Sequence, residues 1–106
     1  YIMKSYIYII GESNDPPLKV GFSDNPDQRL KSLQTGYPKQ LNVLYKKEID
    51  KHITKDMEKL IHKSISYKRT KGEWFNIELD ECISLIEFNF ITYEDKLLEG
   101  LKDLYL

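Results

Sequence analysis

The sequence predicts a single α+β domain in which helices flank a three-stranded sheet, antiparallel or mixed, and a helical extension follows. Three observations support this class. Two β-rich segments lie too close together for a crossover helix, the best amphipathic helix stands in mid-chain, and the last third has helical periodicity. The 106 residues give room for one compact domain. We assign it to residues 3–106, with a core over about 5–90 and a helical tail over about 91–106.

The first two strands are predicted over residues 5–11 and 17–22. The first strand is apolar on both faces, and the second alternates apolar with other residues. Turn-forming residues over 12–17 separate them, so the two strands should pair antiparallel as a hairpin. Side chains alternate between the two faces of a strand. We therefore expect Tyr8 and Lys19 to be neighbours on one face.

A short helix should follow the hairpin. Asn25 can cap its free amides, Pro26 suits its first turn, and residues 34–38 end it with Gly and Pro. Arg29 falls in the second turn of this helix. Residues 41–49 then form a third strand, which we expect to be central in the sheet.

The segment over residues 50–66 is the clearest helix in the chain. Its apolar residues follow one stripe that should face the core; they are Ile53, Met57, Leu60, Ile61 and Ile65. A sector roughly 100° wide outside that stripe carries Lys51, Lys55, Lys59 and His62, with Glu58 toward its edge. Glu58 should therefore reach a cleft from the border of the core.

The last third of the chain should begin with a Gly-containing turn over residues 68–72 and a short extended piece over 73–77. Helical residues follow from about Asp80 to the end, with residues 90–93 as the place where the helix could break. Cys82 stands in this apolar helical pattern, and we interpret it as a small core residue. With only two histidines beside it, the sequence shows no zinc-ligand spacing.

No segment approaches the ~20 apolar residues that cross a bilayer, and the start lacks the long apolar stretch of a secretory signal. We expect an intracellular protein, cytoplasmic or nuclear according to its host, with no membrane contact.

The net charge of −1 conceals a strong asymmetry along the chain. Residues 39–71 hold ten Lys or Arg against four Asp or Glu, whereas residues 72–106 hold two against nine. We expect the middle third to contact a polyanion, although a solvated helix with the acidic tail folded near it explains the same pattern. The cations that could follow a nucleic-acid backbone are Lys51, Lys55, Lys59, Lys68, Arg69 and Lys71.

Four side chains would serve phosphodiester cleavage if the fold brings them together. Glu58 could hold Mg²⁺ or Mn²⁺, which need few protein ligands. Arg29 could place its planar cation on the phosphate. Tyr8 could deprotonate the attacking water if a nearby cation lowers its pKa from about 10, and Lys19 is that cation by strand geometry. The alternatives are surface pairing for Glu58 and Arg29, and core packing for Tyr8.

The spacing of these residues resembles that of the GIY-YIG nuclease superfamily. The matching segments are Tyr6-Ile7-Tyr8, Lys19-Val20-Gly21, Arg29, Glu58 and Gly72-Glu73-Trp74-Phe75. The resemblance covers residues 5 to about 77. It fits best a branch of phage and eukaryotic proteins that has Lys-Ile-Gly or Lys-Val-Gly as its second motif, a His one turn after the glutamate, and a Glu-Trp-Phe segment.

This resemblance implies a three-stranded mixed sheet with flanking helices and hydrolysis of nucleic acid with one divalent metal, Mg²⁺ or Mn²⁺. It implies that Tyr8 is the general base, that Arg29 stabilises the transition state and that Glu58 holds the metal. It also gives His62 a place near the phosphate, and it suggests Asn76 as a residue that orients the site.

Three positions depart from the superfamily pattern. Tyr6 stands where the first motif has glycine, Lys19 where the second motif has tyrosine, and Leu33 where many relatives have His or Tyr. Lysine has a charge that suits phosphate, and some members of the superfamily carry it at this position. The departures bear on the rate and on catalysis itself.

We therefore expect an endonuclease that acts on DNA rather than RNA. One alternative is a binding module that kept the fold and lost the chemistry. Another is a protein-interaction domain whose C-terminal helix docks on a further domain or forms a homodimer; the leucines of that helix are Leu97, Leu98, Leu101 and Leu104.

Overall fold

The computed structural model describes residues 3–105, and the side chains of residues 3–101. In chain order the elements are β1 (Lys4–Gly11), β2 (Leu18–Ser23), α1 (Pro26–Gln34), β3 (Asn42–Asp50), the 3₁₀ turn η1 (Lys51–Ile53), α2 (Thr54–Ile65), the 3₁₀ turn η2 (Ser66–Lys68), β4 (Arg69–Lys71), β5 (Trp74–Phe75) and α3 (Leu79–Tyr105).

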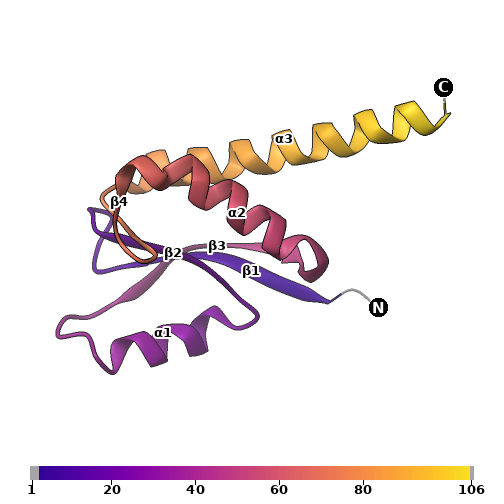
Figure 1. Cartoon of the computed structure of the whole chain (residues 1–106). Helices are drawn as coiled ribbons and strands as arrows, with labels where there is room; N and C mark the ends of the chain where they lie inside the picture. Colours follow the sequence, from indigo (N-terminus) through magenta and orange to yellow (C-terminus); the bar gives the residue numbers. More distant parts are fainter. Residues whose placement is uncertain (1–2, 106) are drawn as a thin grey trace.

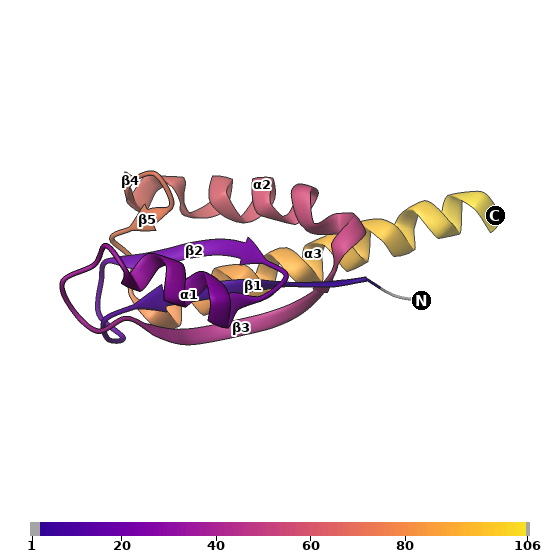
Figure 2. The ribbon, with the colours of Figure 1, turned by 90° about the horizontal axis from the view of Figure 1, so that it is seen from below.

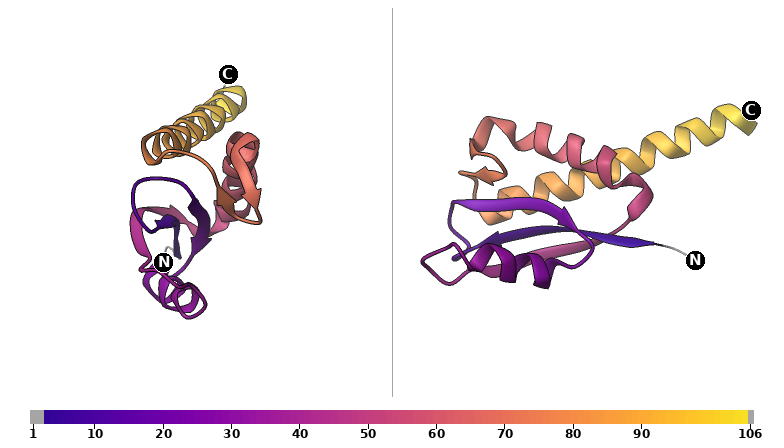
Figure 3. Two further views of the ribbon diagram at one scale, coloured as in Figure 1. Left: turned by 90° about the vertical axis from the view of Figure 1, so that its left-hand side faces the viewer. Right: turned by 60° about the horizontal axis from the view of Figure 1, so that its bottom comes forward.

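The strands form one antiparallel sheet in the order β3-β1-β2-β5-β4. Helix α1 covers one face of this sheet, and α2 and α3 lie over the other (Figure 1). The end-on view in Figure 3 shows the three layers separately. The predicted α+β class is confirmed, and the sheet has two short strands more than the three that the sequence predicted.

The predicted hairpin is confirmed, with β1 and β2 paired antiparallel. Tyr8 stands opposite Gly21, and Ile10 stands opposite Lys19. Tyr8 and Lys19 therefore share a face as diagonal neighbours, roughly 7–8 Å apart by the usual spacing of such pairs.

The prediction that the third strand is central is wrong, because β3 lies at an edge and β1 is central. β1 is buried along Ile7–Gly11, as a strand with neighbours on both sides should be. β3 instead exposes Lys46 and Glu48, and charged side chains of this kind protect an edge strand from pairing with another chain.

The predicted cap and core side of α1 are both confirmed. The Asn25 side chain accepts a hydrogen bond from the Gln28 backbone N–H at 3.2 Å. Leu30 and Leu33 pack against a small core of Tyr8, Ile10 and Leu41 on the α1 face of the sheet.

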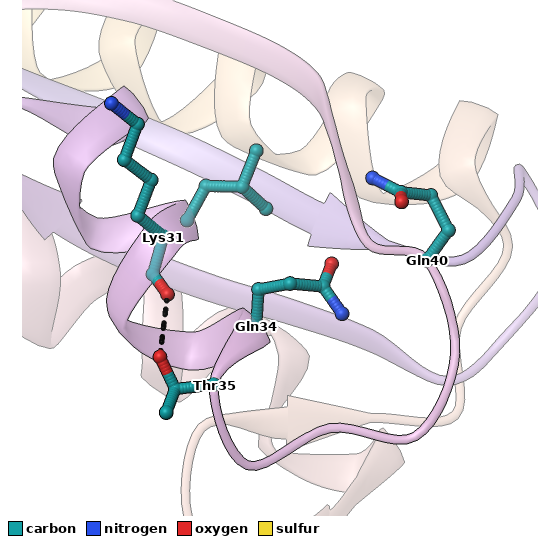
Figure 4. Close-up of a pocket in the computed structure, with 5 residues that line it drawn as sticks. Lys31, Gln34, Thr35 and Gln40 are labelled. Atoms are coloured by element: carbon teal, nitrogen blue, oxygen red, sulfur yellow. Dashed lines mark hydrogen bonds between the residues drawn. The ribbon is translucent and has the colours of Figure 1, made fainter.

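The loop after α1 is closed by Gln34, whose side chain accepts from the Leu41 N–H at 2.7 Å and donates to the Lys39 carbonyl at 2.8 Å. Beside it lies a hollow of about 300 Å³ (Figure 4), lined by Leu30, Lys31, Gln34, Thr35 and Gln40. The Thr35 hydroxyl donates to the Lys31 carbonyl at 3.1 Å. None of the predicted functional residues lines this hollow.

The larger core lies between the sheet and the two other helices. Met57, Ile61 and Ile65 of α2 are fully buried there with Cys82 and Ile86 of α3. The predicted apolar stripe and the core position of Cys82 are thus confirmed. The predicted helix begins as the 3₁₀ turn η1, where the Asp50 carboxylate accepts from the His52 N–H at 2.9 Å.

Helix α3 runs without the break that was allowed for at residues 90–93. The Asn89 side chain donates to the Leu85 carbonyl at 2.8 Å, and the Thr92 hydroxyl donates to the Phe88 carbonyl at 2.9 Å. These polar side chains bond back onto the helix and leave its backbone ladder intact.

The outer part of α3 extends beyond the sheet (Figures 1 and 3). It exposes Leu97, Leu98 and Leu101, whereas the side chain of Leu104 lies outside those described. Within residues 3–105, no helix combines the length and the apolar character that a membrane crossing requires.

The predicted turn over residues 68–72 is wrong for residues 69–71, which form strand β4 of a small hairpin; the connection to β5 is Gly72 and Glu73. Gly72 has a φ of +58°. Glycine adopts this left-handed conformation without the steric cost that a side chain brings. The chain can therefore reverse tightly just before Glu73.

Cys82 should be unreactive in the folded protein. Burial raises the pKa of its thiol to about 12, so the reactive thiolate is almost absent at pH 8 and forms only at much higher pH. We expect labelling by a thiol reagent at pH 8 to be about 1,000-fold slower in the native protein than in denaturant. The control is Ser84→Cys at an exposed position of the same helix, whose added thiol should react at once; equally fast labelling of native Cys82 would contradict the prediction.

Candidate active site

The predicted site lies along the part of β2 that β5 leaves uncovered. β5 pairs only with Leu18 and Lys19 of that strand. Beyond them, α2 approaches the strand (Figure 2), and His62 Nε2 lies 3.1 Å from the Val20 carbonyl oxygen. A carbonyl oxygen only accepts, so this contact assigns the proton of neutral His62 to Nε2. α2 thus contacts the backbone of β2 at this edge.

Tyr8 is 1% exposed and its ring lies over Gly21. A Cβ on residue 21 would stand 2.5 Å from the Tyr8 hydroxyl oxygen and 2.9 Å from Glu73 Oε2. The phenol and the carboxylate therefore share one small space, which exists because residue 21 has no side chain. This is the structural requirement for glycine in the segment Lys19-Val20-Gly21.

Three charged residues act on the Tyr8 hydroxyl. Burial raises the pKa of Tyr8 above its ordinary value of 10.0, a hydrogen bond and the positive charge of Arg29 lower it, and the negative charges of Glu73 and Glu58 raise it. The net shift is upward, which is opposite to the sign that the sequence predicted. The cation at the hydroxyl is Arg29 rather than Lys19, and Tyr8 is a neutral phenol at pH 7.

Arg29 acts on the Tyr8 hydroxyl by a hydrogen bond and its charge, and Glu58 acts on it by its charge. Arg29 and Glu58 line two different hollows, and their convergence on a single pocket stays a prediction. Glu58 is half-buried and lines a hollow of about 390 Å³ with Lys55, Lys59 and His62. Its charge reaches Tyr8 although the helix that carries it packs on the opposite sheet face. Within the described residues, the Glu58 carboxylate forms no salt bridge.

Glu73 also belongs to this site, and it is not among the residues predicted from the sequence. Its carboxylate lies 4.0 Å from His62 Nε2 as well as beside Tyr8. Its backbone carbonyl accepts from the Val20 N–H at 3.1 Å, which fixes the β4–β5 turn against β2. The Glu-Trp-Phe segment was a signal in the sequence, but no pattern placed its first residue against Tyr8.

Lys19 keeps a solvent-accessible ammonium at the end of a buried stem. The residue is 7% exposed, and its Nζ lies 5.6 Å from the centre of the Trp74 ring. Trp74 in turn stacks on Tyr37, with ring centres 5.7 Å apart. In the part of the chain that the structure describes, no carboxylate pairs with Lys19, so its charge is available to an anion.

The predicted nucleic-acid contacts fall into two groups at opposite ends of α2. Lys51 forms a salt bridge with Asp24 at 2.7 Å, whereas Lys55 and Lys59 are exposed beside Glu58. At the far end, the cation of Lys68 lies over the Tyr67 ring and that of Arg69 over the Phe75 ring. Lys71 is exposed on β4.

Asn76 is exposed just after β5, and its backbone N–H donates to the Lys68 carbonyl at 2.7 Å. Its side chain makes no hydrogen bond within the described chain. The structure thus gives Asn76 a place in closing the β4–β5 hairpin, and its predicted role in orienting the site stays a prediction.

Residues 5–90, well over half of the chain, match the family model of the T5orf172 domain. This chain belongs to the T5orf172 domain family. No significant match was found among curated proteins or among solved structures. T5orf172 domains occur in phage and related proteins and are associated with nuclease-type modules. The matched region contains all the predicted site residues.

Gly21→Ala should destabilise the T5orf172 domain. The new methyl group would overlap the Tyr8 hydroxyl and the Glu73 carboxylate, and overpacking of this kind costs about 1–3 kcal/mol. Urea unfolding followed by circular dichroism measures the loss. Gly36→Ala is the matched control, because nothing lies within 4 Å of its added Cβ. Equal stabilities of the two variants would contradict the packing described here.

Proposed function

We propose that this T5orf172 domain is a metal-dependent endonuclease of the GIY-YIG type that hydrolyses phosphodiester bonds in DNA. The proposal is carried by the Tyr8 hydroxyl, on which both the Arg29 guanidinium and the Glu58 carboxylate act. These are the groups that can take a proton from water, stabilise charge on a phosphate and hold a cation. The spacing of the sequence motifs supports the same assignment.

In this proposal Tyr8 takes the proton of the attacking water. Arg29 stabilises the negative charge that develops on the phosphate, and its guanidinium keeps its charge at any physiological pH. Lys19 adds a second cation, whose ammonium would contact a phosphate oxygen. His62 lines the hollow beside Glu58 and contributes its shape and polarity.

Glu58 would hold Mg²⁺ or Mn²⁺. A half-buried carboxylate without a salt-bridge partner in the described chain, at a hollow of about 390 Å³, suits a hydrated ion. Mg²⁺ keeps several waters and binds through one or two carboxylates together with substrate phosphates. The described residues contain no cluster of three side chains placed to ligate a metal, so a single protein carboxylate is the donor set proposed. When bound, the ion supplies positive charge to the scissile phosphate.

The departures from the superfamily pattern are compatible with this chemistry. Lys19 brings a positive charge to the α1 face in place of a second phenol. Leu33 belongs to the apolar packing of α1 against Tyr8 and Ile10, so its position serves the core. Tyr6 is partly buried, with the Lys46 ammonium 5.6 Å from its ring centre.

A nucleic-acid-binding module without catalysis is the second candidate, and the raised pKa of Tyr8 favours it. A phenol that stays neutral is a weak base. α2 is 12 residues long, which corresponds to about 18 Å, and it carries Lys55 and Lys59 beside the hollow. Such a surface would bind phosphates without reading base sequence.

An interaction domain is the third candidate. The side chains of Leu97, Leu98 and Leu101 are about half exposed on the outer part of α3. A homodimer or a further domain that covers this helix stays a prediction, and so does an intracellular location.

The nuclease proposal predicts nicking of supercoiled plasmid by the wild-type chain in Mg²⁺ or Mn²⁺, and none in EDTA. Glu58→Ala should lower the rate at least about 100-fold, because the metal loses its protein ligand. Glu99→Ala, at an exposed position on the outer part of α3, is the matched control and should cut normally. Cleavage of an RNA substrate under the same conditions tests the preference for DNA. Salt-sensitive binding without nicking would support the binding module instead.

Lys55→Ala and Lys59→Ala should each weaken DNA binding to a similar extent for all sequences. Each removes about one phosphate contact, so the slope of log affinity against log salt should decrease by about one. Fluorescence anisotropy at several salt concentrations measures this slope. Lys96→Ala, exposed on α3, is the control. Unchanged slopes for both α2 variants would place the DNA elsewhere.

A further inference from the structure

The Tyr8 hydroxyl has a donor beside it, but it also needs an acceptor. Arg29 has only N–H donors, so in its contact with Tyr8 the phenol oxygen accepts. The proton of the phenol must then point elsewhere. A phenol that takes a proton from water has to release its own, either before or during that step.

Of the groups around Tyr8 in the described chain, Glu73 is placed to accept this proton. Its Oε2 and the Tyr8 oxygen lie 2.9 Å and 2.5 Å from the same point above Gly21. Lys19 and Arg29 carry donors only. His62 directs Nε2 to the Val20 carbonyl, and Glu58 is the proposed metal ligand. A direct hydrogen bond or one bridging water would join Tyr8 to Glu73, and such contacts often tighten only when substrate binds.

The backbone around Glu73 holds its carboxylate in this place. Gly72 supplies the left-handed turn with a φ of +58°, and the Glu73 carbonyl is bonded to the Val20 N–H at 3.1 Å. The next two residues are also fixed in place: Trp74 stacks on Tyr37, and Phe75 is buried in the core. The side chain of Glu73 is 37% exposed, so a proton that it receives can pass on to solvent.

We propose that Glu73 is the proton acceptor of Tyr8. As the water oxygen forms its bond to phosphorus, a water proton moves to the Tyr8 oxygen and the phenol proton moves to Glu73 Oε2. The bond from phosphorus to the leaving oxygen breaks, and the electron pair stays on that oxygen, which takes a proton from solvent. Glu73 later releases its proton to solvent. This inference rests on the proposed nuclease function and assigns Glu73 a positioning role that acts through Tyr8.

The test is a set of variants in the plasmid-nicking assay with Mg²⁺ or Mn²⁺. Glu73→Gln keeps the shape of the side chain and removes the base, so kcat should fall about 100-fold while KM stays within about twofold. Glu73→Asp keeps a carboxylate and should cut at least about tenfold faster than Glu73→Gln. In a Tyr8→Phe background, adding Glu73→Gln should cost no further factor beyond about threefold, because the two residues act as a unit.

Glu78→Gln, at an exposed position before α3, is the matched control and should cut like the wild type. Urea midpoints establish that each variant is folded. A wild-type rate for Glu73→Gln, a change in KM alone, equal rates for the Gln and Asp variants, or losses that multiply in the double variant would overturn this inference and leave the nuclease proposal standing. Absence of nicking by the wild-type chain would overturn both.

Discussion

The short pairing between β2 and β5 is the constraint on which the rest of the site depends. Two residues of β5 cover the start of β2, and the following backbone groups need other partners. The Val20 N–H donates to the Glu73 carbonyl, and the Val20 carbonyl accepts from His62 Nε2. The β4–β5 turn and helix α2 therefore satisfy backbone hydrogen-bonding groups at an edge that could otherwise pair with another strand. The same two contacts bring the Glu73 carboxylate beside the phenol of Tyr8 and place the His62 imidazole 4.0 Å from that carboxylate.

The segment from Gly72 to Phe75 is explained residue by residue by this arrangement. Gly72 makes the turn, Glu73 enters the site, Trp74 lies on the α1 face of the sheet with Tyr37, and Phe75 fills the core beneath His62, whose ring centre is 5.7 Å away. Four consecutive residues thus take four different environments. Because the strand alternates at Trp74 and Phe75, a one-residue shift would exchange these two side chains between the faces of the sheet and withdraw the Glu73 carboxylate.

Periodicity and turn chemistry were enough to predict the first hairpin, the cap of α1 and the buried stripe of α2. They give the faces of elements, but they carry no information on which strands are neighbours, and the edge position of β3 was therefore missed. The upward pKa shift of Tyr8 was also out of reach, because it combines burial with charges from residues 50 and 65 positions later in the chain. Glu73 was missed for the same reason, since its position depends on the pairing of β5.

The acidic last third of the chain has a consequence for how a polyanion could lie on the molecule. Helix α3 exposes Glu94, Asp95 and Glu99 and packs beside α2, whose outer side carries Lys55 and Lys59. A duplex laid along α2 would be attracted on one flank and repelled on the other. This difference in charge between the two flanks would favour approach from one side. It would orient the duplex before any side chain contacts a base.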